Sequence, residues 1–169
     1  MEIDYSPYTY ETIVDAGTLY IFKTDFELLY EVSFKPTPYL FSSDKPFSDD
    51  AYEFSIIVIE NPNHASPPFD NRIGSTIAKI FDSFYEEFGN TISLYICASH
   101  DNRQMVRFRK FHGWFSTFGT SKYVKLEAVP TDKNGNKFPL ALVIRLGNPY
   151  LGDIVTSLQE VISHFQNDK

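Results

Sequence analysis

Four residues with the chemistry of an anion site stand together where a helical pattern begins: Arg72, Gly74, Ser75 and Thr76. The first amides of a helix have no acceptor within the helix, and the helix dipole adds partial positive charge at that end. Gly74 would let an anion approach the backbone, the two hydroxyls would donate to it, and Arg72 would pair with a phosphate. An ordinary capped helix start is the competing interpretation, because every helix has such an N-terminus.

Glu60 and His100 are the candidates for acid–base chemistry. Glu60 ends the apolar run 51–60, and His100 follows the apolar run 91–98. If these runs are adjacent parallel strands, both residues lie at the edge where open α/β sheets place ligands. A carboxylate or imidazole there would deprotonate an amine. The alternative is that each makes only a local hydrogen bond in a loop.

Cations recur at helical spacing between residues 103 and 110, namely Arg103, Arg107 and Lys110, and Arg109 adds a fourth. Such a concentration could bind a phosphate of a cofactor, an RNA backbone or an acidic partner. The alternative is a solvated helix face that pairs with nearby carboxylates. Cys97, in the middle of a predicted strand, is expected to be a small buried apolar residue. The histidines have no metal-ligand spacing, so we expect no metal site.

The segment 70–115 contains the elements that must position these residues. Its first part carries apolar residues on one helical stripe, at Ile73, Ile77, Ile80, Phe81, Phe84 and Phe88. Asp70 or Asn71 can cap this helix. The run 91–98 is β-branched and apolar, as in a buried strand, and Asp101 or Asn102 can cap a second helix. A helix between two strands predicts a crossover, so 51–60 and 91–98 should be parallel neighbours.

The remaining segments predict further strands and a last helix. An edge strand is expected around 10–14, and a hairpin is expected from 18–24 and 27–34. The runs 122–129 and 138–146 flank Asn134-Gly135, a strong hairpin signal. An amphipathic helix should follow Gly152. We therefore expect a single α+β domain over 1–169, with an α/β-like core and a mixed sheet in the order β-β-β-α-β-α-β-β-α.

The succession of strand, glycine-containing loop, helix and strand, followed by Asn102, ten residues and Gly113-Trp114, resembles the acyl-CoA-binding core of the GNAT N-acyltransferase superfamily. The resemblance covers roughly residues 50–146. It implies that acetyl-CoA or another acyl-CoA binds at the Arg72–Thr76 turn and that the acyl group passes to an amine of a small molecule or a protein. The chain also resembles small uncharacterised bacterial proteins.

Three departures from the GNAT pattern favour a degenerate member. The loop has Gly74 alone where the family has two glycines, and Arg109 stands where the family has its catalytic tyrosine. The two substrate-gripping helices near the family's N-terminus have no counterpart. A non-catalytic protein-interaction module is therefore the alternative function.

The composition excludes several classes of protein. A net charge of −7 disfavours nonspecific binding to nucleic acid or to an anionic membrane by the whole surface. The single cysteine excludes an internal disulfide and a cysteine-based zinc site. No apolar run approaches the roughly 18 residues of a spanning helix, so we expect a cytoplasmic protein without a membrane segment.

Overall fold

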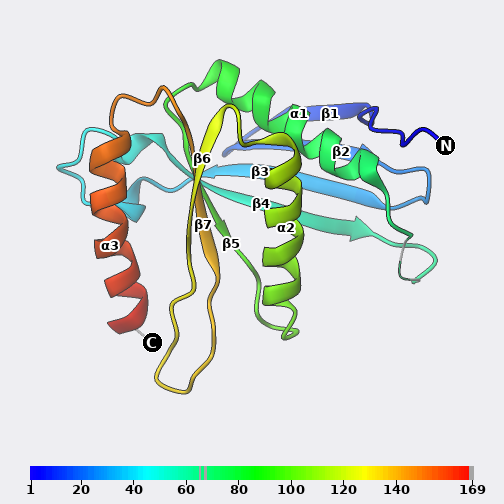
Figure 1. The fold of residues 1–169 in the computed structure, drawn as a ribbon. Coiled ribbons are helices and arrows are strands. Elements are labelled where there is room, and N and C mark those ends of the chain that lie inside the picture. Colours follow the sequence, from blue (N-terminus) through cyan, green and yellow to red (C-terminus); the bar gives the residue numbers. More distant parts are fainter. Residues whose placement is uncertain (65, 67, 168–169) are drawn as a thin grey trace.

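A computed structural model describes residues 1–64, 66 and 68–167, and in this part of the chain a seven-stranded sheet carries three α-helices (Figure 1). The elements in chain order are β1 (Tyr10–Val14), β2 (Thr18–Lys23), β3 (Leu29–Pro36), the 3₁₀ turns η1 (Pro38–Leu40) and η2 (Ser48–Asp50), β4 (Ala51–Glu60), α1 (Asn71–Glu87), β5 (Ile92–Ile96), α2 (Gln104–Phe118), β6 (Tyr123–Ala128), β7 (Leu140–Arg145) and α3 (Leu151–Asn167). The predicted α+β class and mixed sheet are confirmed, and β1 is the expected edge strand. The element order is roughly as predicted, but four strands and not three precede α1.

The strand order is β1-β2-β3-β4-β5-β7-β6, and β4 and β5 are parallel neighbours as predicted. All other neighbouring strands are antiparallel. The parallel register covers four positions, from Ala51↔Ile92 to Phe54↔Tyr95. Beyond Phe54, β4 continues along β3 to Glu60 while β5 runs in a different direction (Figure 1). The sheet is therefore split between β4 and β5, because residues 55–60 of β4 do not pair with β5.

A front layer formed by α1 and α2 covers one face of the sheet with an aromatic core. Phe34 of β3 stacks on Phe84 of α1 with ring centroids 3.9 Å apart. Tyr95 of β5 packs against Phe111 of α2 at 4.4 Å. Aromatic pairs of this kind contribute about 0.5–1.5 kcal/mol each beyond their buried area. The many phenylalanines and tyrosines of the sequence thus link the sheet to both crossover helices.

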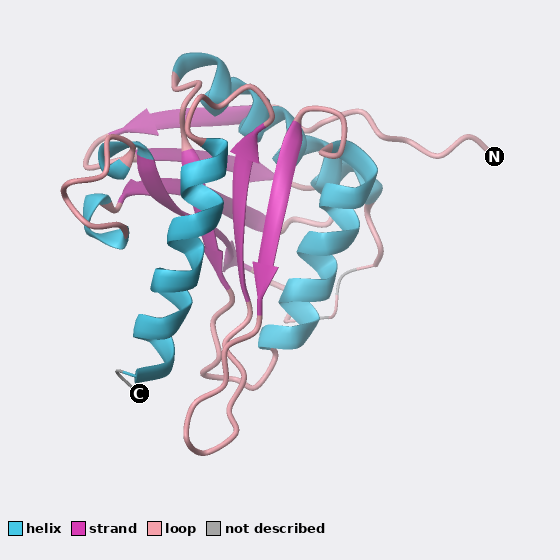
Figure 2. Cartoon of the chain, turned by 60° about the vertical axis from the view of Figure 1, so that its left-hand side comes forward, coloured by secondary structure: helices cyan, strands magenta, loops and turns pink. Residues whose placement is uncertain are grey.

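A rear layer formed by α3 and the 3₁₀ turns covers the other face, but only over half of the sheet (Figure 2). Ile154 of α3 is fully buried with Leu142 and Ile144 of β7. This rear core takes no described residue from β1, β2 or β3. On β4, Ile57 and Ile59 lie beyond the last residue paired with β5 and remain 46% and 42% exposed.

The helix starts differ in how their amides are satisfied. Asp70 caps α1 as predicted, with its Oδ1 accepting from the amide of Arg72 at 2.9 Å. The prediction that Asp101 or Asn102 caps α2 is wrong, because Asn102 has a left-handed φ of 56° and Arg103 is the N-cap, without a side-chain bond. Asp101 instead accepts from the amide of Arg103 at 3.1 Å, just outside the helix.

The predicted hairpin is confirmed as β6 paired antiparallel with β7, from Tyr123↔Arg145 to Ala128↔Leu140. In its connection Gly135 has a φ of 83°, a left-handed conformation that favours glycine. The carboxylate of Asp132 accepts from the amides of Asn134 and Asn136 and so braces the turn. Among the described residues no helix combines the length and apolar character needed to cross a bilayer.

Candidate functional site

A cleft of about 510 Å³ lies where the start of α1 meets the exposed side of α2. Its walls come from the N-terminal segment, β3, the residues that open α1, and α2; they are Tyr5, Tyr30, Pro68, Phe69, Asp70, Asn71, Ile73, Arg109, Lys110, Gly113, Trp114, Thr117 and Phe118. This volume is in the range of small-molecule sites, which are mostly apolar with a few charged groups. The cleft combines aromatic walls with two cations and is our candidate site.

Two of the four predicted cations, Arg109 and Lys110, line this cleft. Lys110 Nζ lies 5.1 Å from the centroid of the Trp114 ring, a cation–π distance. The pKa of Lys110 is lowered, first by desolvation and then by the charge of Arg103. Arg107, by contrast, donates to both carboxylate oxygens of Asp101, at 2.7 and 2.5 Å. The alternative of a paired helix face therefore holds for Arg107, whereas Arg109 and Lys110 face a cleft.

Arg72 does not line the cleft but a neighbouring hollow of about 380 Å³ beside the N-terminal segment. Its guanidinium lies 3.9 Å from the centroid of the Tyr8 ring and donates to the carbonyl of Ser6 at 2.9 Å. It also pairs with Asp25 at 2.7 Å. The residue predicted to bind a phosphate is thus already paired with a carboxylate.

Gly74 permits the close approach of a helix. A Cβ at this position would lie 2.7 Å from Cδ1 of Trp114 and 3.1 Å from a ring carbon of Phe118. The predicted approach of an anion at Gly74 requires this residue to be exposed, but it is buried where α1 contacts α2. The glycine is required by the side chains of α2, which lie against the backbone of α1.

The hydroxyls of Ser75 and Thr76 have partners inside the protein. Both donate to the carbonyl of Arg72, at 3.0 and 2.6 Å. Thr76 also accepts from the amide of Tyr8 at 2.8 Å. The structure brings Arg72, Gly74, Ser75 and Thr76 together at the start of α1, as predicted, but gives each of them a role in capping or packing. That they bind a phosphate stays a prediction.

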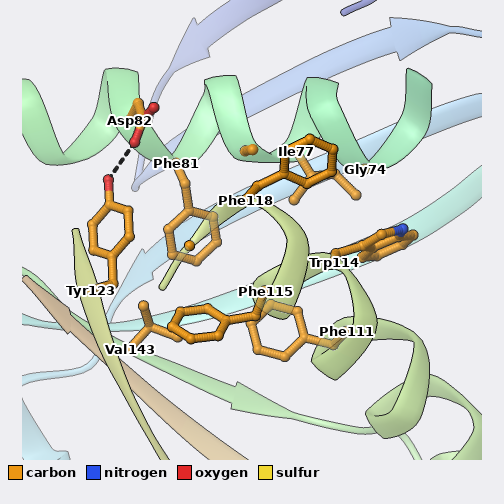
Figure 3. A pocket seen from close by; sticks show the side chains of 12 residues that line it. Gly74, Ile77, Phe81, Asp82, Phe111, Trp114, Phe115, Phe118, Tyr123 and Val143 are labelled. Carbon is orange, nitrogen blue, oxygen red and sulfur yellow. Dashed lines mark hydrogen bonds between the residues drawn. The ribbon is translucent and has the colours of Figure 1, made fainter. Parts of the chain in front are cut away.

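Between α1 and α2 a small cavity of about 40 Å³ remains (Figure 3). Phe81, Phe111 and Phe115 fill most of the space around it. At its edge Tyr123 donates a hydrogen bond to Asp82 at 2.7 Å. Since the space between the helices holds no more than a few waters, a ligand of this face would lie in the outer cleft.

Glu60 is the last residue of β4 and His100 follows β5, as predicted, and both are exposed. The strands separate after Phe54 and Tyr95, so Glu60 lies six positions beyond the last parallel pair. Within the described part of the chain no hydrogen bond or ion pair joins the two residues, and neither lines the cleft. Their roles in acid–base chemistry stay predictions.

The sequence did not reveal Lys110 and Trp114 as a wall of the cleft, because Trp114 is considered there only as part of the Gly113-Trp114 pattern of the GNAT resemblance. Trp114 is half-buried and lines both the cleft and the cavity. The signal was in the spacing, since Lys110 and Trp114, like Arg109 and Gly113, are four residues apart and share a helix face.

Comparison with known proteins identifies a family but no activity. No curated protein and no solved structure matches the chain significantly. A model described as a family of unknown function, DUF6169, matches residues 69–160, which is more than half of the chain. The match begins beside the cap of α1 and includes every residue of α2, and so it covers most of the cleft. The chain therefore belongs to the DUF6169 family of unknown function.

Proposed function

We propose that this chain is a degenerate GNAT-like domain that binds acetyl-CoA or another acyl-CoA and transfers the acyl group to an amine. The observation that carries the proposal is the split in the sheet. A single parallel pair, β4 and β5, holds together over four positions and then separates, within the order β1-β2-β3-β4-β5-β7-β6. The GNAT resemblance implies an acyl-CoA beside such a split.

The residues of the cleft fit the chemistry of the proposed cofactor. Arg109 would attract its phosphates, and the exposed rings of Phe69 and Tyr5 offer apolar contact area. The amides at the start of α1 contribute less than a free helix end, because Asp70 already accepts from Arg72. We therefore move the expected phosphate contacts from the Arg72–Thr76 turn toward α2.

When bound, an acyl-CoA would supply the acyl group as an activated thioester. The chain would then hold an amine against that group and exclude water from it. Holding two reactants in a productive geometry can be worth about 7–11 kcal/mol of the barrier. Glu60 or His100 would accept the proton of the amine.

Titration with acetyl-CoA tests the proposal, and the emission of Trp114 reports on it because this is the chain's single tryptophan. We expect saturable binding that changes this emission and raises the melting temperature; ligand at 100 times its Kd stabilises by about 2.7 kcal/mol. Arg109→Gln should weaken binding roughly tenfold, since a charged hydrogen bond contributes about 1.5–3 kcal/mol. No change in emission or melting temperature at millimolar acetyl-CoA would refute the proposal.

Lys79→Gln is the matched control for Arg109→Gln. Lys79 is an exposed cation on the neighbouring helix α1 and does not line the cleft. Both variants remove one positive charge, so they change the net charge equally. If both variants lowered the affinity for acetyl-CoA equally, only the overall charge would matter, and the cleft would be excluded as the binding site.

A protein-interaction module is the second candidate, favoured by the uncovered rear face of β1–β4. Ile13, Ile57 and Ile59 are 42–46% exposed on this face, and single-domain proteins rarely leave large contiguous apolar patches open to water. Ile57→Asp should abolish association with such a partner while leaving the melting temperature nearly unchanged. An unchanged complex in that variant would remove this face from the interaction.

A further inference from the structure

We propose that Lys110 is a nucleophilic lysine of the cleft and that it accepts an acyl group from an activated acyl ester. With a thioester as donor, the inference rests on the proposed acyl-CoA binding. The Nζ lone pair forms a bond to the acyl carbon, the carbon–sulfur bond breaks, and the thiolate takes up the proton that nitrogen loses. The products are an amide on Lys110 and a free thiol, and no oxidant or metal is needed.

Lys110 is placed where a ligand can reach it. It lies on α2 in the wall of the 510 Å³ cleft, one helical turn before Trp114. Its Nζ lies 5.1 Å from the centroid of the indole ring. Both side chains line the cleft. An acyl donor in the cleft would therefore meet the amine directly.

Lys110 also lacks a carboxylate partner. The chain has 22 acidic residues against 15 lysines and arginines, and several of its cations do pair with a carboxylate. Lys122 pairs with Asp82 at 2.9 Å, and Lys125 pairs with Glu127. Among the described residues no ion pair involves Lys110, whose amine instead lies near the Trp114 ring. An unpaired ammonium is easier to deprotonate than one held by a carboxylate.

The charges around Lys110 act in the same direction. Desolvation and then the charge of Arg103 lower its pKa. Arg109 adds a second cation to the same wall, and the other titratable groups of the cleft are Tyr5, Tyr30 and Asp70. The Asp70 carboxylate is occupied, because it accepts from the amide of Arg72 at 2.9 Å and from the Tyr8 hydroxyl at 2.8 Å. Lysines near other cations or in apolar surroundings are the ones that proteins use as nucleophiles.

Lys79 offers an internal control in the same molecule. It is exposed on α1, and its Nζ lies 5.8 Å from the centroid of the Tyr10 ring. It therefore has an aromatic neighbour comparable to that of Lys110, but it does not line the cleft. A difference in reactivity between the two amines would thus come from the cleft and its cations, and not from the aromatic contact.

The test is trace acetylation of the whole folded chain at neutral pH, once with N-hydroxysuccinimidyl acetate and once with acetyl-CoA, followed by peptide mass spectrometry. We expect the small ester to label Lys110 several-fold faster than Lys79, and the ratio to fall as the pH rises toward the ordinary pKa of lysine. Acetyl-CoA should label Lys110 first. A ratio at or below one with the small ester overturns the inference, whatever acetyl-CoA does.

The two donors separate this inference from the proposed function. Selective labelling by the small ester without labelling by acetyl-CoA would support the nucleophile and count against acyl-CoA as donor. Arg103→Gln removes a neighbouring charge from an exposed position, so it should slow the labelling of Lys110 while that of Lys79 stays constant. Equal rates for Lys110 in this variant and in the unchanged chain would contradict the electrostatic part of the inference.

Discussion

The two halves of the sheet bury their rear faces to very different extents. In the half formed by β5, β7 and β6, α3 lies on the rear face, and β7 is buried along Leu140–Ile144 on both faces. In the half formed by β1–β4 burial alternates most clearly along β3, which is half-buried, buried, half-buried and buried from Leu29 onward. A strand covered on both sides has a continuous apolar sequence, whereas a strand covered on one side alternates. The pattern of each strand thus indicates whether a second layer lies on it.

The test with the largest expected change in stability truncates one isoleucine in each half of the sheet. Ile144→Ala removes a fully buried side chain from the covered half and should cost about 2–5 kcal/mol of unfolding free energy. Ile57→Ala makes the same change on the uncovered face, where the side chain is 46% exposed, and should cost about 1 kcal/mol or less. Thermal melts measure both, at roughly 2–4 °C per kcal/mol. Equal losses would mean that another surface covers Ile57 in solution.

A glycine in each helical layer gives the next test. Gly74→Ala in α1 would place a Cβ 2.7 Å from Trp114 and should destabilise by about 1–3 kcal/mol. Gly152→Ala in α3 has nothing within 4 Å of the added Cβ and should stabilise by up to about 1 kcal/mol. Urea unfolding of the two variants compares them. A stabilised Gly74→Ala would contradict the close contact between α1 and α2.

The turns of the two halves should respond with opposite signs. Gly135→Val in the covered half forces a β-branched residue to a φ of 83° and should cost about 1–2 kcal/mol. Glu27 in the β2–β3 turn already has a φ of 62°, so Glu27→Gly should stabilise by about 1 kcal/mol or less, reduced by the entropy of glycine. The melting temperatures of the two variants measure these changes in stability. An unchanged melting temperature for Gly135→Val would mean that the turn adopts another conformation.

Alkaline pH should weaken the front layer first. Burial raises the pKa of four tyrosines in that core, which are Tyr20, Tyr85, Tyr95 and Tyr123. The pKa of Tyr20 is raised to about 12. In the unfolded chain these phenols titrate near about pH 10, so their contribution is complete below that value and is lost as the pH rises toward their folded pKa values. The melting temperature between about pH 9 and 11 measures the loss.

Tyr85→Phe provides the check on that prediction. It removes one titrating phenol and its hydrogen bond to the carbonyl of Val143 at 2.6 Å. The variant should be less stable at neutral pH but lose less stability on going to alkaline pH. A slope identical to that of the unchanged chain would exclude Tyr85 from the alkaline transition.

Local patterns predicted much of the fold but little of the site. The apolar stripe from Ile73 to Phe88 predicted α1, and Asp70 predicted its start, because both signals lie within one element. The contacts of Arg72 could not be predicted in this way, because its partners Asp25 and Ser6 are 47 and 66 residues away in the sequence. Gly74 was likewise assigned to a ligand because nothing in its own segment shows that Trp114 lies against it. Periodicity determines which face of an element is buried, whereas the partners on that face come from distant segments.

The attachment of Tyr8 to α1 has a consequence for the order of events during synthesis. The Tyr8 amide donates to Thr76 and its hydroxyl donates to Asp70, over separations of 68 and 62 residues. At 5–20 residues per second, roughly 3–14 s pass between the translation of Tyr8 and that of Thr76. During this interval Tyr8 and the phenylalanines of β2 and β3 have no helix to pack on, so the nascent chain exposes an aromatic surface that is prone to aggregation. The front layer closes only after α1 has left the ribosome.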